Sequence, residues 1–135
     1  MKSLFTTRYS SSSFNVALLV LRLGFGILLM YHGYDKMQHF DTMKTQFISF
    51  MGLSPSMSLS LVIFAELFCS ALVVLGLLTR LATIPIIITM VVAIAKAHNY
   101  DITGQGQAAA LYLFGFLAIL FLGAGKASVD GAIGK

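Results

Sequence analysis

Four apolar runs, each close to the length of a membrane span, dominate this chain. They cover about residues 14–34, 55–78, 81–97 and 107–123. A helix needs about 20 apolar residues to cross roughly 30 Å of hydrocarbon. Inside lipid every backbone N–H and C=O must be bonded within the chain, and uninterrupted runs of this length achieve that as helices rather than as barrel strands. The predicted fold is therefore all-α: a four-helix transmembrane bundle forming one integral membrane domain over residues 1–135.

The composition points the same way. Hydrophobic residues make up 58% of the chain and charged residues 10%, whereas a soluble domain has about 25% charged residues. So few charges cannot cover a water-facing surface, and the lipid bilayer is the expected partner. The net charge is +4, but the basic residues are scattered between apolar runs, so no nucleic-acid partner is expected. A single cysteine, Cys69, excludes both an intramolecular disulfide and a thiol relay.

The segment between the first two runs has a different pattern. Its apolar residues Phe40, Met43, Phe47 and Phe50 recur at helical spacing, with polar residues between them. This spacing predicts an amphipathic helix lying in the membrane interface. The alternative is an ordinary loop with scattered apolar residues.

Basic residues predict the orientation, because cytoplasmic loops carry the excess of Lys and Arg. Four spans place both termini on one side, together with the turn at residues 76–80. The basic residues of that side, opposed only by Asp130, are Lys2, Arg8, Arg80, Lys126 and Lys135. The three lysines of the other side, Lys36, Lys44 and Lys96, are balanced by Asp35, Asp41 and Asp101. Both termini are therefore expected on the cytoplasmic side.

Two full charges, Arg22 and Glu66, lie inside predicted spans, at roughly 2.5–3.5 kcal/mol each on insertion scales. Arg22 lies about 12 Å from the cytoplasmic end of its helix, and Glu66 about 13 Å from the same side. These depths predict an Arg22–Glu66 pair. Such a pair could fix the register of two helices, or it could act in function as a proton relay.

The first helix carries a polar stripe that continues from Arg22. Gly33 and Lys36 lie within about 40° of Arg22 around the helix, and His32 lies about 80° away. Glycines on this stripe would let another helix or a flat ligand approach the backbone.

Lys96 and His98 end the third run on the same outer side, and both can face the interior only if that helix has unwound by His98. A ligand pocket near the outer leaflet is therefore predicted. The alternative is that the lysines reach out to the lipid headgroups. His32 and His98 lack metal-ligand spacing, so neither haem nor a metal is expected.

Several motifs resemble the DoxX family. They are Arg-Leu-Gly at 22–24, Tyr-His-Gly-Tyr-Asp-Lys at 31–36, Glu66 in the second span, Gly-Leu-Leu-Thr-Arg at 76–80, and Gly-Ala-Gly-Lys at 123–126 with Val-Asp at 129–130. The resemblance covers roughly residues 16–130. It implies a four-helix membrane protein of the bacterial cytoplasmic (inner) membrane. Some relatives are subunits of a thiosulfate:quinone oxidoreductase, others are linked to oxidative-stress complexes, and for many no activity is established.

The leading functional hypothesis is therefore the membrane subunit of a quinone-linked oxidoreductase. His32, Lys36, Gly33, Lys96 and His98 would bind the quinone. Glu66 would relay a proton, and Arg22 would hold its charge. The chain cannot perform redox chemistry unaided, so other membrane subunits or a homo-oligomer are expected.

Two alternatives remain open. The first is a non-enzymatic membrane subunit or assembly partner, in which the polar stripe serves helix packing. The second is a small transporter or proton pathway along Arg22 and Glu66, although the chain shows no inverted repeat of the kind usual in transporters.

Overall fold

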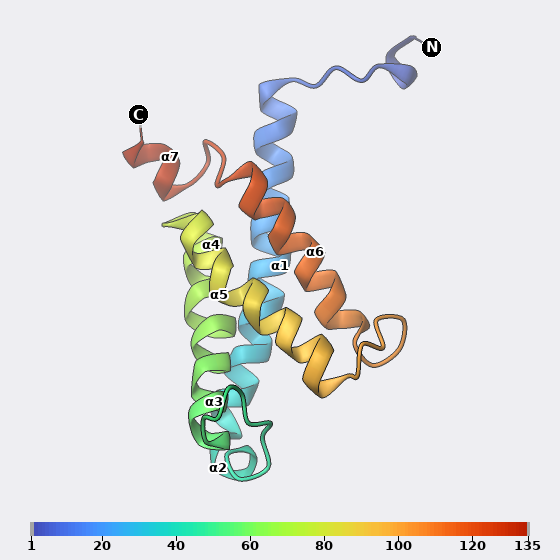
Figure 1. The fold of residues 1–135 in the computed structure, drawn as a ribbon. Coiled ribbons are helices and arrows are strands. Elements are labelled where there is room, and N and C mark those ends of the chain that lie inside the picture. Colours follow the sequence, from blue (N-terminus) through green and yellow to red (C-terminus); the bar gives the residue numbers. More distant parts are fainter. Residues whose placement is uncertain (1, 135) are drawn as a thin grey trace.

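A computed structural model of the chain describes residues 2–134, and every regular element among them is a helix (Figure 1). The α-helices that build the bundle are α1 (Ser11–Gln38), α3 (Pro55–Ile63), α4 (Ser70–Leu75), α5 (Thr79–Val92) and α6 (Gln107–Leu122). The short ones are η1 (Lys2–Phe5), α2 (Phe40–Met43) and α7 (Val129–Ile133). Two π-helical stretches, η2 (Phe64–Cys69) and η3 (Ala93–Ala97), continue α3 into α4 and extend α5.

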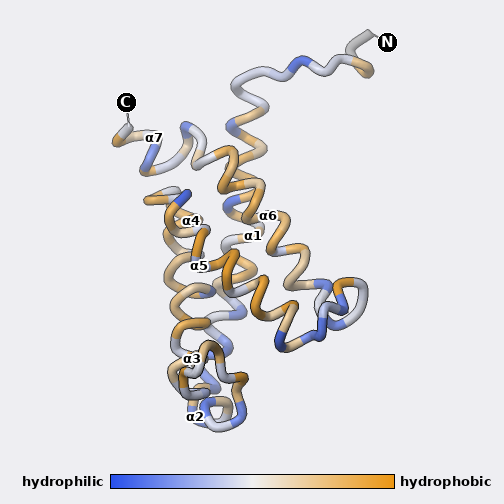
Figure 2. Tube along the Cα trace, in the orientation of Figure 1, coloured by the Kyte–Doolittle hydropathy of each residue, from blue (hydrophilic) through white to orange (hydrophobic). Residues whose placement is uncertain are grey.

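Three of these helices are long and apolar enough to cross a membrane: Ser11–Gln38, Pro55–Leu75 and Thr79–Ala97. The fourth, α6, is apolar but has only 16 residues. Hydrophobic residues follow the helices along their length, whereas hydrophilic residues gather in the connections (Figure 2). The molecule is thus a helical membrane protein with lipid-facing apolar sides.

Local signals in the sequence set where the helices start. The Ser10 side chain accepts a hydrogen bond from the Ser13 N–H at 3.0 Å, and the Ser54 side chain accepts one from the Met57 N–H at 3.2 Å. Pro55 occupies the first turn of α3, where its missing N–H leaves no donor unsatisfied. The starts of α1 and α3 therefore follow from local serine caps.

Helix α1 packs against α4, η2 and α6, and α5 packs against α6. Buried residues from these helices form the core: Leu29, Val73, Ile86, Phe116 and Ile119. The two termini lie at one end of the bundle, called here the terminal end (Figure 1). The connections at residues 39–54 and 98–106 lie toward the other end, called here the loop end.

The amphipathic helix predicted after the first span is much shorter than expected. Helix α1 continues to Gln38, α2 comprises four residues, and residues 48–50 have no regular structure. Met51 and Gly52 have φ values of 50° and 76°, and this left-handed turn returns the chain to the start of α3. The Phe50 N–H donates to the Ser58 hydroxyl at 3.0 Å. These contacts fold the segment back onto α3, which a continuous helix could not do.

Asp130 of α7 caps α5 from a distance at the terminal end. Its carboxylate accepts hydrogen bonds from the Leu78 N–H at 2.8 Å and the Thr79 N–H at 2.9 Å. Burial alone would raise the pKa of Asp130, but the hydrogen bonds from Thr79 and Leu78, together with the charge of Arg22, outweigh it, and the pKa is lowered. The carboxylate thus stays ionised on the N–H groups that open α5.

Candidate functional site

A cavity of about 490 Å³ lies between α1, η2, α5, η3 and α6, toward the loop end. Most of its lining is apolar. The polar residues among its lining are His32, Lys36, Ser58, Glu66, Thr89, Lys96, His98 and Tyr112. A mostly apolar cavity of this size with a few convergent polar groups is typical of a site for a small organic ligand. We call it the α1–α5 pocket.

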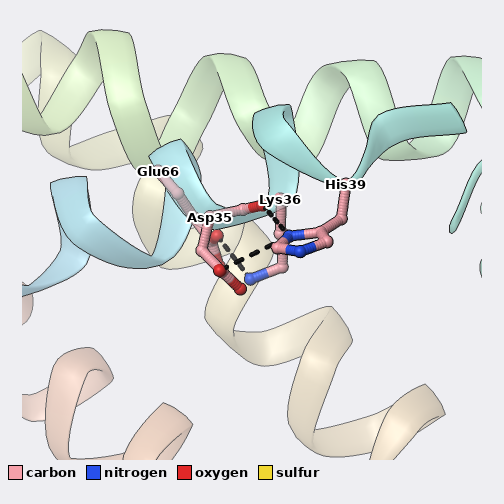
Figure 3. Close-up of polar contacts among 4 residues, drawn as sticks. All are labelled: Asp35, Lys36, His39 and Glu66. Atoms are coloured by element: carbon pink, nitrogen blue, oxygen red, sulfur yellow. Dashed lines mark hydrogen bonds and ion pairs between the residues drawn. The ribbon is translucent and has the colours of Figure 1, made fainter. Parts of the chain in front are cut away.

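An ion pair between α1 and η2 forms the polar centre of the pocket. The Lys36 Nζ lies 2.7 Å from a Glu66 carboxylate oxygen, and the two side chains are 23% and 7% exposed. Figure 3 shows both side chains converging, next to the separate contact of Asp35 with His39. That second pair is at 3.5 Å and about 60% exposed, and neither of its members lines the pocket. The Lys36–Glu66 pair is therefore the buried charge pair of this region.

The predicted Arg22–Glu66 pair is wrong. Arg22 is 2% exposed and donates to backbone carbonyls only, those of Val73 (3.0 Å), Val74 (2.9 Å), Ala124 (2.9 Å) and Ala127 (2.7 Å). The guanidinium ties α1 to the end of α4 and to the segment before α7. The Arg22 side chain extends toward the terminal end of α1, where these carbonyls lie. Glu66 instead pairs with Lys36 on the loop-end side.

Both π-helical stretches carry a charged residue that lines the pocket, Glu66 in η2 and Lys96 in η3. A π-helix adds a residue to the turn and rotates the following side chains, and such stretches frequently occur at functional sites. After η3 the chain leaves helical geometry at His98, with φ −122° and ψ 9°. Lys96 and His98 can therefore both line one cavity, as the sequence required of an unwound helix end.

Helix α6 contributes an aromatic wall. The ring of Tyr112 lies 5.8 Å from that of His32, edge to face, and 6.1 Å from that of Phe25. His98 also lines the pocket, and among residues 2–134 its Nδ1 atom is buried without a hydrogen-bond partner.

Gly33 allows α1 and η2 to touch rather than binding a ligand directly. A Cβ at this position would lie 2.7 Å from the Leu67 backbone nitrogen and 2.8 Å from the Glu66 carbonyl carbon. Both atoms belong to the backbone and cannot swing aside. Gly33 thus sets the distance at which Lys36 reaches Glu66.

We expect Gly33→Ala to destabilise the protein by about 1–3 kcal/mol, because the added methyl group forces two helices apart. Gly24 provides the control, since a Cβ there meets nothing within 4 Å. Gly24→Ala should leave stability unchanged or raise it by up to about 1 kcal/mol. Unfolding in detergent with increasing sodium dodecyl sulfate measures both. Equal stability of the two variants would contradict the close helix contact.

Three further lining residues, Phe47, Ile48 and Phe50, come from the connection before α3. The helical spacing of Phe47 and Phe50 predicts an interfacial helix, and their aromatic character was the available signal for a pocket wall. The polar residue Asp101 does not line the pocket and accepts a hydrogen bond from the Gly104 N–H at 3.0 Å. Among residues 2–134, no cluster of three or more His, Cys, Asp or Glu side chains could hold a metal.

Fold and pocket together define a small helical membrane protein with a ligand-sized cavity between its helices. The family model DoxX matches residues 17–99. The chain therefore belongs to the DoxX family, a family of small membrane proteins. The matched region runs from residue 17, within α1, past the end of η3, and thus contains Arg22, Glu66 and every other candidate residue. No curated protein and no solved structure matches the chain.

Proposed function

We propose that this protein is the membrane subunit of a quinone-linked oxidoreductase and holds a quinone headgroup in the α1–α5 pocket. The observation that carries this proposal is the Lys36–Glu66 ion pair at 2.7 Å facing an apolar cavity. A charge pair at this depth is costly in lipid and usually marks a functional site. A quinone ring is flat and apolar with polar oxygens, so its site requires hydrogen-bond donors in an apolar cavity. The Lys36 ammonium group is such a donor.

The residues of the pocket fit such a headgroup. Lys36 can donate from Nζ to a carbonyl oxygen, and His32 or His98, which line the same cavity, can donate to a second one. Glu66 can take up or release a proton next to Lys36, with no movement of η2. A bound quinone would supply the two-electron chemistry, and a partner subunit would supply the electrons. Arg22 and Gly33 act as positioning residues that hold α1 against α4 and η2.

We further propose that the chain crosses the bacterial cytoplasmic membrane four times, with both termini in the cytoplasm. The 16 residues of α6 amount to about 24 Å of helix, somewhat less than the hydrocarbon thickness, so α6 would stand with little tilt and thin the bilayer locally. Helix α2 and the connection that follows it would then lie at the outer interface. Other subunits or further copies of this chain would cover part of the apolar sides.

The test is the quinone content of the protein purified in mild detergent, per mole of chain. The pocket variant is Lys36→Met combined with Glu66→Gln, which removes both charges and therefore leaves no unpaired charge in the pocket. Its matched control is Lys44→Met with Asp41→Asn, which removes an exposed pair at 3.3 Å outside the pocket. We expect near-stoichiometric quinone in the wild type and the control, and at least a tenfold loss in the pocket variant.

A quinone content no higher than that of an unrelated membrane protein would refute this function. Equal content in the pocket variant and the control would place any bound quinone elsewhere. A background quinone content in the wild type would favour the assembly role, and proteins co-purified with the wild type would then be the next measurement.

A further inference from the structure

The α1–α5 pocket combines polar and apolar lining residues. Its charged and imidazole side chains are those of His32, Lys36, Glu66, Lys96 and His98. Three of its apolar lining residues, Leu61, Phe64 and Ile88, are also 47–50% exposed. A residue that lines a cavity and is half exposed lies at its rim, so the pocket opens here.

This apolar rim lies at the depth of the lipid tails. Ile88 is nine residues into α5, or about 14 Å along the helix from its start at the terminal end. Phe64 is nine residues beyond Pro55, or about 14 Å from the start of its span at the loop end. Both positions fall well inside a hydrocarbon layer of roughly 30 Å. The rim therefore opens into lipid and not into water.

The arrangement of the helices explains the opening. Helix α5 packs along α4 and η2 near the terminal end and then leads away from α3 toward the loop end (Figure 1). Leu61 of α3 and Ile88 of α5 stand on the two sides of this divergence, and both line the pocket.

We propose that the ligand of this pocket is a tailed lipid that enters sideways from the bilayer between α3 and α5. Its polar head lies at Lys36, Lys96 and the histidines, and its tail leaves over Leu61, Phe64 and Ile88. The position of the head rests on the proposed function, whereas the side entrance follows from the rim itself. A quinone with an isoprenoid tail and a membrane phospholipid share this design of polar head and long apolar tail, and the experiment below separates them.

The first measurement uses the full chain in lipid nanodiscs and a benzoquinone in two forms, one with an isoprenoid tail and one with a methyl group in its place. Concentrations are expressed per lipid to correct for partitioning. We expect the tailed form to bind at least tenfold more tightly. Ile88→Trp should weaken that binding at least tenfold and change binding of the tail-less form less than twofold. Ile84→Trp is the control, because Ile84 is similarly exposed on α5 (45% against 50%) but does not line the pocket.

The second measurement uses a phosphatidylcholine with a photoreactive diazirine at the end of its tail. Leu29 and Met90 line the pocket and are only 1% and 2% exposed, so a tail labels them only from inside. Labelling of these residues in the wild type and in Ile84→Trp, reduced at least fivefold in Ile88→Trp, supports the side entrance. If this labelling is observed while neither benzoquinone binds, the side entrance is supported and the quinone function is refuted.

The side entrance is overturned if the tail adds nothing to benzoquinone binding and Leu29 and Met90 remain unlabelled. Tail-dependent binding that Ile88→Trp weakens, without labelling by the phospholipid, supports the entrance and identifies the quinone as the preferred head.

Discussion

Replacing Arg22 by methionine is expected to reduce the stability of the folded bundle by about 3 kcal/mol or more. The guanidinium donates to four backbone carbonyls, at Val73, Val74, Ala124 and Ala127. The Val73 carbonyl keeps a second hydrogen bond from the Gly76 N–H at 3.0 Å, and each of the other three loses the arginine donor at a cost of about 1–3 kcal/mol. The cost of placing the arginine charge in the membrane is largely common to the folded protein and to its separated helices, so removing that charge offsets little. Unfolding by sodium dodecyl sulfate, followed by circular dichroism, measures the difference.

Two further variants serve as controls for Arg22→Met. Arg22→Lys keeps the charge but lacks the planar fork that reaches four acceptors, so its loss should be intermediate. Arg80→Met removes an exposed arginine whose single hydrogen bond, to the Phe121 carbonyl, is long at 3.4 Å, and it should change stability by less than about 0.5 kcal/mol. If Arg22→Met unfolds at the same detergent fraction as Arg80→Met, the guanidinium does not hold the C-terminal segment.

The helices were largely predictable because the apolar runs and their caps are local properties of the chain. The predicted run at 107–123 became Gln107–Leu122, and the run at 81–97 became Thr79–Ala97. The segment after α1 was not predictable in the same way. The helical spacing of four apolar residues is compatible with an interfacial helix and also with a loop whose aromatic rings point into a pocket. The tertiary contact of Phe50 with Ser58 decides between the two.

Of the seven candidate site residues, five line one cavity: His32, Lys36, Glu66, Lys96 and His98. Arg22 and Gly33 do not line it, and the predicted pairing of Glu66 was wrong. Depth along a helix places Cα atoms, however, whereas long side chains reach several ångströms up or down. That reach separates Arg22 from Glu66 and joins Lys36 to it. The capping of α5 by Asp130 was equally hidden, because the partners stand about fifty residues apart and nothing in the local pattern links them.

The Lys36–Glu66 pair should respond asymmetrically to the loss of either partner. Glu66 is 7% exposed and Lys36 is 23% exposed. Lys36→Met removes the ammonium group that contacts this carboxylate, and breaking a buried pair costs about 3–5 kcal/mol. Glu66→Gln leaves a lysine whose flexible stem can carry its ammonium group to the interface, so this variant should lose only about 1 kcal/mol.

The double variant Lys36→Met with Glu66→Gln separates the pair from its parts. Because it buries no uncompensated charge, it should be more stable than Lys36→Met alone, with a favourable coupling of at least about 1 kcal/mol between the two substitutions. Stability of all four proteins in the same detergent, from their unfolding midpoints, gives this coupling directly. Additive losses would mean that Lys36 and Glu66 act independently. Without coupling, the protonation of Glu66 would not depend on Lys36, and the two could not act together as a proton site. The polar centre of the pocket would then have to be sought at His32, Lys96 and His98.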